Sequence, residues 1–504
     1  MTGNTGAEDM KEKGTVVLFQ PSVRVGRERQ PRMNVPLGLL AIATPLDMAG
    51  YQVTVIDQYF DRQWKARLRS ELEKNPICVG VSVKTGPQIR NALEVSKLVK
   101  AQGDIPMVWG GVHPSLLPEQ TLENENIDII VQGEGEETFF ELVQALERGE
   151  NLGDIKGIWY KENGIIKQTP PRPFIDLNTH PYPSYHFVDV KRHLVKIFGI
   201  DHLRFSSSRG CPHDCGFCYN AVFNKRKWRA LTAERTVDEL VKLRNTYGVR
   251  GFNLTDDFFF GDSERVKKIF AEMVKRKLDI VFSKIDMHGD EIAKLDDNFL
   301  ALLEKAGCKT LVLGIESGSQ RILDLIHKDI SISQIIDFNK RIQKFQICPK
   351  YCFMLGFPTE TEQDISDTIS LIFKLIEDND KLLKDINLYT PYPGTELFDI
   401  SVQNGLKPPE KLEDWVSFNW RTINRKNTPW ITKEREKLLK MLHFSSNFLE
   451  KNYYLNPIRQ TNPLVTMLAR LYHPLAKMRV KNLFYRFPIE IKLVEWLHLY
   501  TRQE

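Results

Sequence analysis

The chain has 504 residues, with 70 basic and 65 acidic side chains, a formal net charge of +5 and 42% apolar residues. This composition is ordinary for a globular protein and excludes wholesale disorder and a collagen-like repeat. No run of about 18 apolar residues occurs, which argues against a membrane-spanning helix, and we expect no secretory signal in the polar N-terminus. At roughly 150 residues per domain, the length suggests about three domains.

Strand-like and helix-like segments alternate over residues 12–150. Near-continuous apolar strands separated by helices are typical of a parallel sheet with helices on both faces. We therefore predict an α/β fold in which residues 12–150 form a doubly wound, Rossmann-like parallel sheet. The expected strands are Thr15–Gln20, Gln52–Asp57, Ile77–Val83, Pro106–Trp109 and Ile127–Val131, and the expected helices are residues 37–50, 87–102 and 136–148.

Three loops with glycine or polar residues follow expected strands of this sheet. They contain Thr85, the pair Gly110-Gly111, and the pair Gly133-Glu134. In open α/β sheets, ligands bind at the carboxyl ends of strands, where glycine lets the backbone approach a ligand closely. The loops lack a GxGxxG pattern, so they do not indicate a dinucleotide. Simple tight turns explain them equally well.

A second alternating series occupies residues 201–425. It follows a stretch with five prolines, residues 151–200, which we expect to be a connector. Six strand–helix units predict a partial (β/α)6 barrel like part of a TIM barrel. Residues 426–504 lack a strand signal and predict a helical extension with breaks at Pro457, Pro463, Pro474 and Pro488. The expected strands are Leu203–Ser207, Gly251–Leu254, Ile280–Ile285, Thr310–Ile315, Tyr351–Leu355 and Asp385–Leu388, and the helices are residues 234–246, 263–277, 297–306, 319–326, 332–345 and 362–377.

Three of the seven cysteines, Cys211, Cys215 and Cys218, cluster after the first strand of this second series. In an intracellular chain, such a cluster suggests metal binding rather than disulfides. Three thiolates can ligate three irons of a 4Fe–4S cube and leave the fourth iron open to a small molecule. The alternative is a zinc site completed by His213 or His202, although zinc usually takes paired CxxC ligands. The remaining cysteines are expected to be buried structural thiols.

The motif CPHDCGFC, placed after the first strand of a six-unit partial barrel, resembles the radical S-adenosylmethionine superfamily. The preceding domain resembles a cobalamin-binding domain through LGLLAIATPLDMAGYQVTVID, WGGVHPSLLP and IIVQGEGEETF. Together they resemble the cobalamin-dependent radical S-adenosylmethionine group, which includes anaerobic magnesium-protoporphyrin ester cyclase and class B radical methyltransferases. The implied domains are a cobalamin-binding domain at 12–150, a connector at 151–200, a radical S-adenosylmethionine core at 201–425 and a basic helical extension at 426–504.

The resemblance also implies roles for individual residues. Cys211, Cys215 and Cys218 would be the catalytic residues that hold the cluster, and the open iron would chelate the amino and carboxylate groups of S-adenosylmethionine. Two of the contacts named next have structural alternatives. The acidic pair Asp256-Asp257 can be a solvated turn, and Ser317 can be a helix N-cap. The other implied cofactor contacts are Phe217, Asp256, Asp257, Glu316, Ser317 and Gly356 in the barrel, and Thr85, Gly110, Gly111, Gly133 and Glu134 in the cobalamin domain.

One departure concerns the lower ligand of the cobalt. Cobalamin domains with a histidine ligand carry Asp-x-His-x-x-Gly, and residues 12–150 lack this motif; their only histidine is His113. The string Asp286-Met287-His288-Gly289 lies in the barrel and has the wrong spacing. The sequence therefore implies either cobalamin bound without that ligand or a domain that has lost cobalamin. We expect His113 to be a turn residue.

The implied activity is methyl transfer to an unactivated carbon of a small-molecule or lipid substrate through a 5′-deoxyadenosyl radical. It implies an oxygen-sensitive cytoplasmic enzyme, supplied with electrons by a donor such as flavodoxin or ferredoxin. Two alternatives remain: a cyclase-like oxidation or rearrangement without methyl transfer, and a non-catalytic cobalamin- or redox-sensing protein. An RNA methylthiotransferase is disfavoured because only Cys78 is available for its second cluster, and no nucleic-acid partner is expected.

The basic charge is concentrated in the tail. Residues 425–504 carry 15 basic and 6 acidic side chains, and the preceding residues sum to −4. A basic amphipathic helix can make a peripheral contact with an anionic membrane surface. The favoured alternative is a helical cap over the barrel with a solvated basic face.

Overall fold

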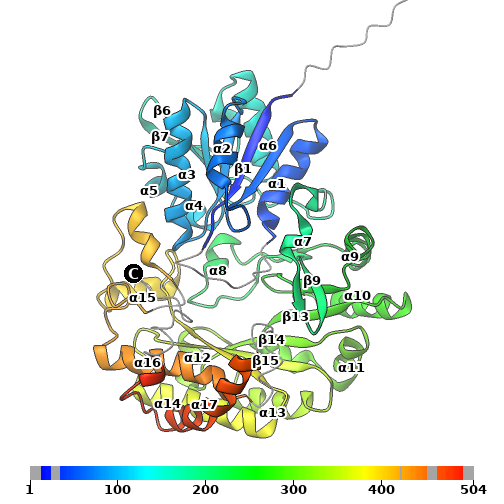
Figure 1. Ribbon diagram of the computed structural model, residues 1–504, viewed down its shortest axis with the longest axis vertical. Helices are drawn as coiled ribbons and strands as arrows, with labels where there is room; N and C mark the ends of the chain where they lie inside the picture. Colours follow the sequence, from blue (N-terminus) through cyan, green and yellow to red (C-terminus); the bar gives the residue numbers. More distant parts are fainter. Residues whose placement is uncertain (1–12, 24–34, 420–422, 451–462, 492–504) are drawn as a thin grey trace, which may run out of the picture. The chain divides into compact units, whose positions relative to one another are not determined.

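The computed structural model describes residues 13–23, 35–419, 423–450 and 463–491. The chain divides into two compact units (Figure 1). Of the described residues, the first unit comprises 13–23, 36–175 and 180–189, and the second comprises 35, 176–179, 190–419, 423–450 and 463–491.

The first unit is built on a seven-stranded sheet in the order β2-β1-β3-β4-β5-β6-β7. Strands β1 to β5 are parallel, and β6 and β7 add an antiparallel hairpin at one edge. The prediction of a doubly wound parallel sheet is confirmed. The hairpin lies within the proline-rich stretch that we expected to be a connector. The strands are β1 (Thr15–Gln20), β2 (Gln52–Asp57), β3 (Cys78–Ser82), β4 (Met107–Gly110), β5 (Ile129–Val131), β6 (Ile158–Glu162) and β7 (Ile165–Gln168).

Helices cover both faces of this sheet. α1 packs against α6 on one face, while Lys65 of α2 and Glu94 of α3 form an ion pair on the other. The central strands are buried on both sides; Val16, Val17, Leu18 and Phe19 of β1 are each 0% exposed. The helices of this unit are α1 (Leu37–Met48), α2 (Trp64–Leu72), α3 (Gln88–Gln102), α4 (Val112–Leu116), α5 (Pro118–Leu122), α6 (Glu136–Arg148), η1 (Leu152–Asp154) and η2 (Tyr185–Phe187).

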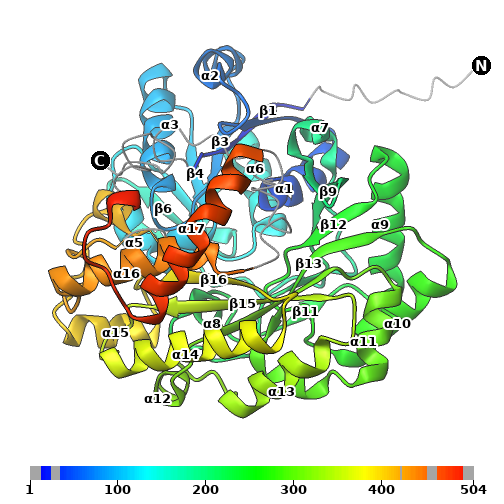
Figure 2. The same cartoon turned by 60° about the horizontal axis from the view of Figure 1, so that its bottom comes forward.

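The second unit contains a curled seven-stranded sheet in the order β16-β15-β14-β13-β12-β9-β8 (Figure 2). Six strands are parallel, and β8 pairs antiparallel at the edge. The predicted partial (β/α)6 barrel is confirmed. The strands are β8 (Val195–Ile197), β9 (Ile200–Phe205), β10 (Ser208–Arg209), β11 (Arg229–Ala230), β12 (Gly251–Leu254), β13 (Val281–His288), β14 (Thr310–Glu316), β15 (Cys348–Leu355) and β16 (Leu383–Leu388), with β10 and β11 forming a separate ribbon.

Helices follow the parallel strands and cover the convex face of the sheet. Local signals set their ends: the Asp262 side chain accepts from the Glu264 and Arg265 N–H groups at the start of α10, and Gly248 ends α9 in a left-handed conformation. The helices of this unit before the C-terminal extension are α7 (Val190–His193), α8 (Tyr219–Phe223), α9 (Ala233–Tyr247), α10 (Ser263–Lys275), η3 (Gly289–Lys294), α11 (Asp297–Lys305), α12 (Gln320–Leu325), α13 (Ile332–Ile342), α14 (Glu362–Asp378), α15 (Glu396–Gln403) and η4 (Leu412–Ser417).

The C-terminal extension is helical where the structure describes it. It contains α16 (Lys433–Ser445), η5 (Ser446–Phe448) and α17 (Pro463–Lys481), and α17 packs on α16, η5 and α14. The predicted break at Pro474 is wrong, because Pro474 lies inside α17. Pro463 is the first residue of that helix, where a missing N–H costs nothing. Pro457 falls outside the described residues.

Candidate functional site

The three clustered cysteines lie on one loop between β10 and α8, after the carboxyl end of β9. The Cys218 N–H donates to the Cys215 carbonyl oxygen at 2.9 Å, which closes a turn. Two further backbone bonds hold Gly216: its N–H donates to Ile326 at 3.1 Å, and its carbonyl accepts from Leu397 at 2.8 Å. The segment that follows α12 and the start of α15 therefore fix the loop from two sides.

The chemistry of the three thiols fits an iron–sulfur cluster. Burial raises the pKa of the Cys211 and Cys218 thiols to about 12, and it also raises the pKa of Cys215. Cys215 and Cys218 raise the pKa of Cys211 further, while nearby Lys328 lowers it. Because the thiolate is the ligand form, three thiolates can coexist here only with bound positive charge. A 4Fe–4S cluster with three cysteine ligands supplies that charge.

Lys328 and Glu316 form a buried ion pair beside the thiols. Lys328 is 4% exposed, and its Nζ donates to Glu316 Oε1 at 3.2 Å. Glu316 ends β14 with a left-handed φ of 69°, a conformation that costs a non-glycine residue energy and often marks a functional position. Burial alone would lower the pKa of Lys328, but Glu316 and the thiols raise it above its ordinary value. Lys328 is therefore charged, and sequence analysis did not identify it.

Phe217, the aromatic residue of the motif, packs into an apolar cluster. Its ring lies 6.3 Å from the Phe357 ring, and Lys328 Nζ lies 5.8 Å from the Phe217 ring centroid. Gly356 precedes Phe357 with a φ of 92°, and its N–H and carbonyl are bonded to Glu360 and Trp430. Phe217 thus lies beside Lys328, whereas Gly356 forms the turn after β15 and accepts a hydrogen bond from Trp430 of the extension.

The two aspartates after β12 behave differently. Asp256 is 4% exposed, and its Oδ1 accepts from the Ser207 N–H (3.0 Å), the Ser207 hydroxyl (2.9 Å) and the Ser208 hydroxyl (2.5 Å). Asp257 is exposed, and its Oδ2 accepts from the Gly210 N–H at 3.0 Å. Asp256 therefore ties β9 to β12, while Asp257 is positioned directly beside the residue that precedes Cys211.

Ser317 points away from the cysteine loop. It is 0% exposed, and its hydroxyl bonds to the Thr368 hydroxyl of α14 at 3.1 Å and accepts from the Ser319 N–H at 3.1 Å. These contacts fix the turn after β14 against α14. Ser317 helps to position Glu316 rather than to face a ligand.

Gly210 permits the close packing that shapes the cysteine loop. Its φ is 82°, and a Cβ added there would lie 2.0 Å from the Lys227 carbonyl oxygen. The neighbouring residues Lys225 and Arg226 are also left-handed, with φ of 50° and 56°. The Arg226 guanidinium donates to Asp214 at 2.8 Å. We call residues 225–227 the basic turn; it flanks the loop and is exposed to solvent.

Two histidines lie beside Cys215, and they bear on the zinc alternative. His288 Nε2 is 3.4 Å from Cys215 Sγ, and His288 Nδ1 is 2.6 Å from Asp290 Oδ1. His213 stacks on His288 with ring centroids 3.7 Å apart and planes at 12°. Imidazole binds metal in its ring plane at about 2.0–2.1 Å, so the two stacked rings cannot both direct a nitrogen to one zinc ion, and only one of them is available to complete such a site.

His202, the other zinc candidate, is too far along the strand. It begins β9 near Ile200, whose carbonyl it contacts at 2.9 Å, and its ring packs on Gly251. The cysteines follow the opposite end of β9. His202 therefore cannot complete a zinc site with the three cysteines.

The first unit brings most of its expected cofactor contacts to one sheet edge. Ser115 donates to the Gly111 carbonyl at 2.7 Å and accepts from the Gly133 N–H at 2.9 Å, which joins the ends of β4 and β5. Gly111 and Gly133 have φ of 94° and 82°, and a Cβ at Gly133 would meet nothing within 4 Å. Gly133 therefore faces open space, whereas a Cβ at Gly111 would lie 2.9 Å from the Val83 backbone, so that only glycine fits there.

Thr85 and Glu134 form hydrogen bonds with other residues of the first unit. The Thr85 hydroxyl lies 3.0 Å from His113 Nδ1, and Glu134 accepts from the Ile175 N–H at 3.0 Å. His113 is 0% exposed, and burial lowers its pKa to about 3. His113 is thus a buried neutral residue. Sequence analysis did not identify Ser115, although it lies four residues after Gly111.

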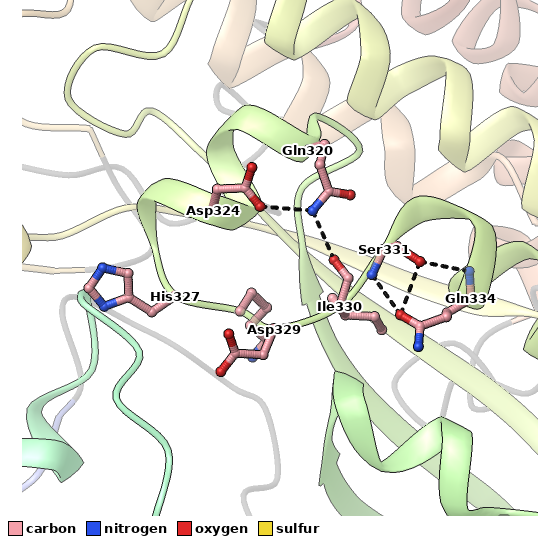
Figure 3. Close-up of a pocket in the computed structure, with 8 residues that line it drawn as sticks. Gln320, Asp324, His327, Asp329, Ile330, Ser331 and Gln334 are labelled. Carbon is pink, nitrogen blue, oxygen red and sulfur yellow. Dashed lines mark hydrogen bonds between the residues drawn. The ribbon is translucent and has the colours of Figure 1, made fainter.

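An open cavity of about 450 Å³ lies between α12 and α13, and Lys328 is one of the residues that line it (Figure 3). Its polar groups are bonded to one another: Gln320 donates to Asp324 at 2.9 Å and to the Ile330 carbonyl at 3.1 Å, and Ser331 and Gln334 form the capping box of α13. These contacts occupy five of the lining residues, and Lys328 belongs to the Lys328–Glu316 pair, so we assign no separate ligand to this cavity.

Two family models match the chain: the radical S-adenosylmethionine superfamily over residues 205–372, and a B12-binding domain over residues 33–143. An uncharacterized methyltransferase of Pyrococcus horikoshii is 32% identical over 462 residues, covering 89% of this chain and 94% of its own. The cytidylyl-2-hydroxyethylphosphonate methyltransferase of Streptomyces wedmorensis is 24% identical and covers 83% and 87%. The radical S-adenosylmethionine methyltransferase TsrM of Kitasatospora setae, solved with tryptophan substrate and a cofactor analogue, shares the fold at a TM-score of 0.70 with 17% identity, covering 96% and 100%.

Proposed function

Because the chain belongs to the cobalamin-binding radical S-adenosylmethionine family, we propose that it transfers a methyl group to an unactivated carbon of a small-molecule substrate. The observation that carries the proposal is the loop with Cys211, Cys215 and Cys218 beside the Lys328–Glu316 pair; Cys215 is buried and the other two are half-buried. The family's cofactors are a 4Fe–4S cluster, S-adenosylmethionine and cobalamin. When bound, they supply the radical chemistry and the methyl group.

The protein's own residues bind and orient these groups. Cys211, Cys215 and Cys218 hold the cluster. Next to them, the Glu316 carboxylate offers an acceptor for an ammonium group, and the Lys328 ammonium offers a donor to a carboxylate. This pair of opposite charges complements the amino-acid end of S-adenosylmethionine. Asp257, exposed beside Gly210, offers a second acceptor.

In the first unit, Gly110, Gly111 and Gly133 lie at the carboxyl ends of β4 and β5, and the open space at Gly133 supports a bound corrin ring there. His113 is buried against Thr85, which supports cobalamin bound without a histidine below the cobalt. The cytoplasmic location stays a prediction. Among the described residues, no helix is long and apolar enough to cross a bilayer.

The basic turn is a suitable docking surface for an acidic electron donor such as a flavodoxin or ferredoxin. Lys225 and Lys227 are exposed beside the cysteine loop, where their charge can steer a partner of opposite charge. The double change Lys225→Glu and Lys227→Glu should slow cluster reduction by reduced flavodoxin but not by dithionite. The matched change Lys268→Glu and Lys275→Glu on α10 should slow neither. If flavodoxin reduces the cluster at equal rates in both variants, the basic turn is not the docking surface.

The exposed face of α17 supports a peripheral membrane contact. Leu471, Leu475 and Met478 are 71%, 39% and 41% exposed on one side of the helix, and no acidic residue occurs between residues 463 and 489. An apolar stripe with basic neighbours binds anionic lipid surfaces. The change Leu471→Glu and Leu475→Glu should abolish co-sedimentation with phosphatidylglycerol vesicles. If the unaltered protein stays in the supernatant, the extension is only a cap.

The products of anaerobic turnover test the proposed activity. Methyl transfer requires both S-adenosylhomocysteine and 5′-deoxyadenosine from S-adenosylmethionine, whereas a cyclase-like oxidation or rearrangement gives 5′-deoxyadenosine alone. A sensing protein gives neither. Finding 5′-deoxyadenosine alone, with methylated cobalamin present, would contradict methyl transfer.

A further inference from the structure

The concave face of the second sheet carries ionised side chains instead of an apolar filling. Alternation along the strands places polar residues on this face, and these residues are half-buried. Their neighbours in sequence on the convex face are apolar and buried; Ile285, Leu313 and Tyr351 are each 0% exposed. The polar residues of the concave face include Arg204, Lys284, Asp286, Lys350, Asp385 and Asn387.

This composition differs from that of a packed core. Branched apolar side chains fill the interior of a closed (β/α)8 barrel, whereas this sheet is open and its concave face carries charged groups, which are rarely buried unless paired. Here Lys284 pairs with Asp286 at 2.6 Å, and Lys350 on β15 pairs with Asp385 on β16 at 2.5 Å. The Lys350 and Asp385 side chains remain 31% and 38% accessible. In each pair, the Lys and Asp side chains balance each other's charge, and both still have polar atoms that a ligand can reach.

The charged face is continuous with the cofactor site. Cys352 pairs in register with Gly314 on one side and with Asp385 on the other, and Gly314 lies two residues before Glu316. Cys352 interacts electrostatically with Lys350, Asp385 and Glu316. A molecule that contacts Lys350 and Asp385 would thus lie next to the Lys328–Glu316 pair.

We infer that the substrate is a water-soluble small molecule with ionised groups, bound on this face by the Lys350–Asp385 and Lys284–Asp286 pairs. The inference rests on the proposed function, since it places the substrate of that reaction. An apolar lipid would remove water from these charges without replacing its hydrogen bonds, which is unfavourable. An ionised substrate can exchange with each pair through charge-assisted hydrogen bonds.

The alternative is a purely structural role, in which the ion pairs hold neighbouring strands together and bind no ligand. Buried ion pairs are weak evidence for stability, and replacing both partners by apolar side chains is often neutral or stabilising. The double variant Lys350→Met/Asp385→Leu should therefore keep the melting temperature and cluster content of the unaltered protein. If it unfolds at a markedly lower temperature, the pair is structural and the inference loses this support.

The direct test uses the cofactor-loaded full chain and an anaerobic extract of cells that make the protein. The extract is partitioned between water and chloroform, and each phase is tested for its ability to stimulate 5′-deoxyadenosine formation. We expect the aqueous phase to stimulate it. Stimulation by the chloroform phase alone, or by neither phase, would overturn the inference.

Two variants test whether the stimulating compound binds on the concave face of the second sheet. The Lys350→Met/Asp385→Leu protein should lose the response to the aqueous phase by about tenfold or more, the loss expected for one charge-assisted contact. The control Lys374→Met/Asp378→Leu removes an ion pair of 2.7 Å on α14 and should respond fully. A full response from both variants would overturn the assignment. Stimulation without S-adenosylhomocysteine would instead refute methyl transfer and leave the substrate class standing.

Discussion

Lys328 Nζ lies 3.2 Å from Glu316 Oε1, and the two side chains are 5% and 9% exposed beside the three thiols. Glu316 ends β14, whereas Lys328 comes from the segment after α12, so that folding alone brings them together. The pair places one fixed positive and one fixed negative charge next to the cluster loop. The proposed binding of the amino-acid end of S-adenosylmethionine depends most directly on this pair.

Removing one member of this pair should destabilise the protein. Lys328→Met leaves the Glu316 carboxylate buried without its partner, which costs roughly 3–5 kcal/mol of unfolding free energy. The double change with Glu316→Gln should recover much of that loss. Urea unfolding measures both. The control Lys344→Met breaks an exposed pair with Asp297 and should cost less than about 1 kcal/mol; an equal loss in both single variants would show that the buried pair has no special role.

The cysteine assignment predicts a selective loss of iron. Cys215→Ala removes one of three ligands, and we expect the protein to lose nearly all iron and acid-labile sulfide after anaerobic reconstitution. Cys352→Ser is the control, because Cys352 lies on β15 outside the loop, and it should keep the cluster. If Cys215→Ala retains a full cluster, the ligand set is wrong.

Gly210 should be irreplaceable by alanine. A left-handed residue with a Cβ costs about 1–2 kcal/mol in strain, and here the Cβ would also lie 2.0 Å from the Lys227 carbonyl. Gly210→Ala should therefore shift Cys211 and lower cluster content. Gly248→Ala has a similar φ of 68° with nothing within 4 Å, so it should cost only the strain and keep the cluster. Both variants carry the backbone strain, but only Gly210→Ala adds the steric clash with Lys227, so a lower iron content in that variant alone identifies the clash as the cause.

Asp364 should contribute stability that acid removes. Burial alone would raise its pKa, but hydrogen bonds from Arg321, Ser319 and Thr361 hold the pKa of this carboxyl well below its usual range. A depressed pKa stabilises the fold above about pH 4, the unfolded value, and that contribution is lost as the pH falls towards the folded value. Asp364→Asn should therefore destabilise the protein at pH 7 and have a smaller effect at pH 3. Urea unfolding across this range would contradict the account if the difference stayed constant.

Much of the fold was accessible from sequence because its signals are local. Apolar strands alternating with amphipathic helices located β1, β2 and β12 to the residue, and the cysteine spacing located the loop. The hairpin of β6 and β7 was missed, because its short half-exposed strands carry no apolar run.

Long-range contacts explain what the sequence could not provide. His288 was set aside for its spacing, yet β13 places it 3.4 Å from Cys215. Ser317 matched a family position but turns into α14, where it meets Thr368. The amino-acid sequence around His288 or Ser317 does not show whether the side chain points to the cysteine loop or to a neighbouring helix. Only packing of the whole unit distinguishes the two.

The most direct test of the account is electron paramagnetic resonance of the anaerobically reconstituted, reduced protein, recorded with and without S-adenosylmethionine. A cluster held by Cys211, Cys215 and Cys218 with one open iron should give a 4Fe–4S signal whose g values change when S-adenosylmethionine is added. The Cys215→Ala protein should give no such signal. A signal that S-adenosylmethionine leaves unchanged, or a protein that binds zinc in place of iron, would contradict the central claim.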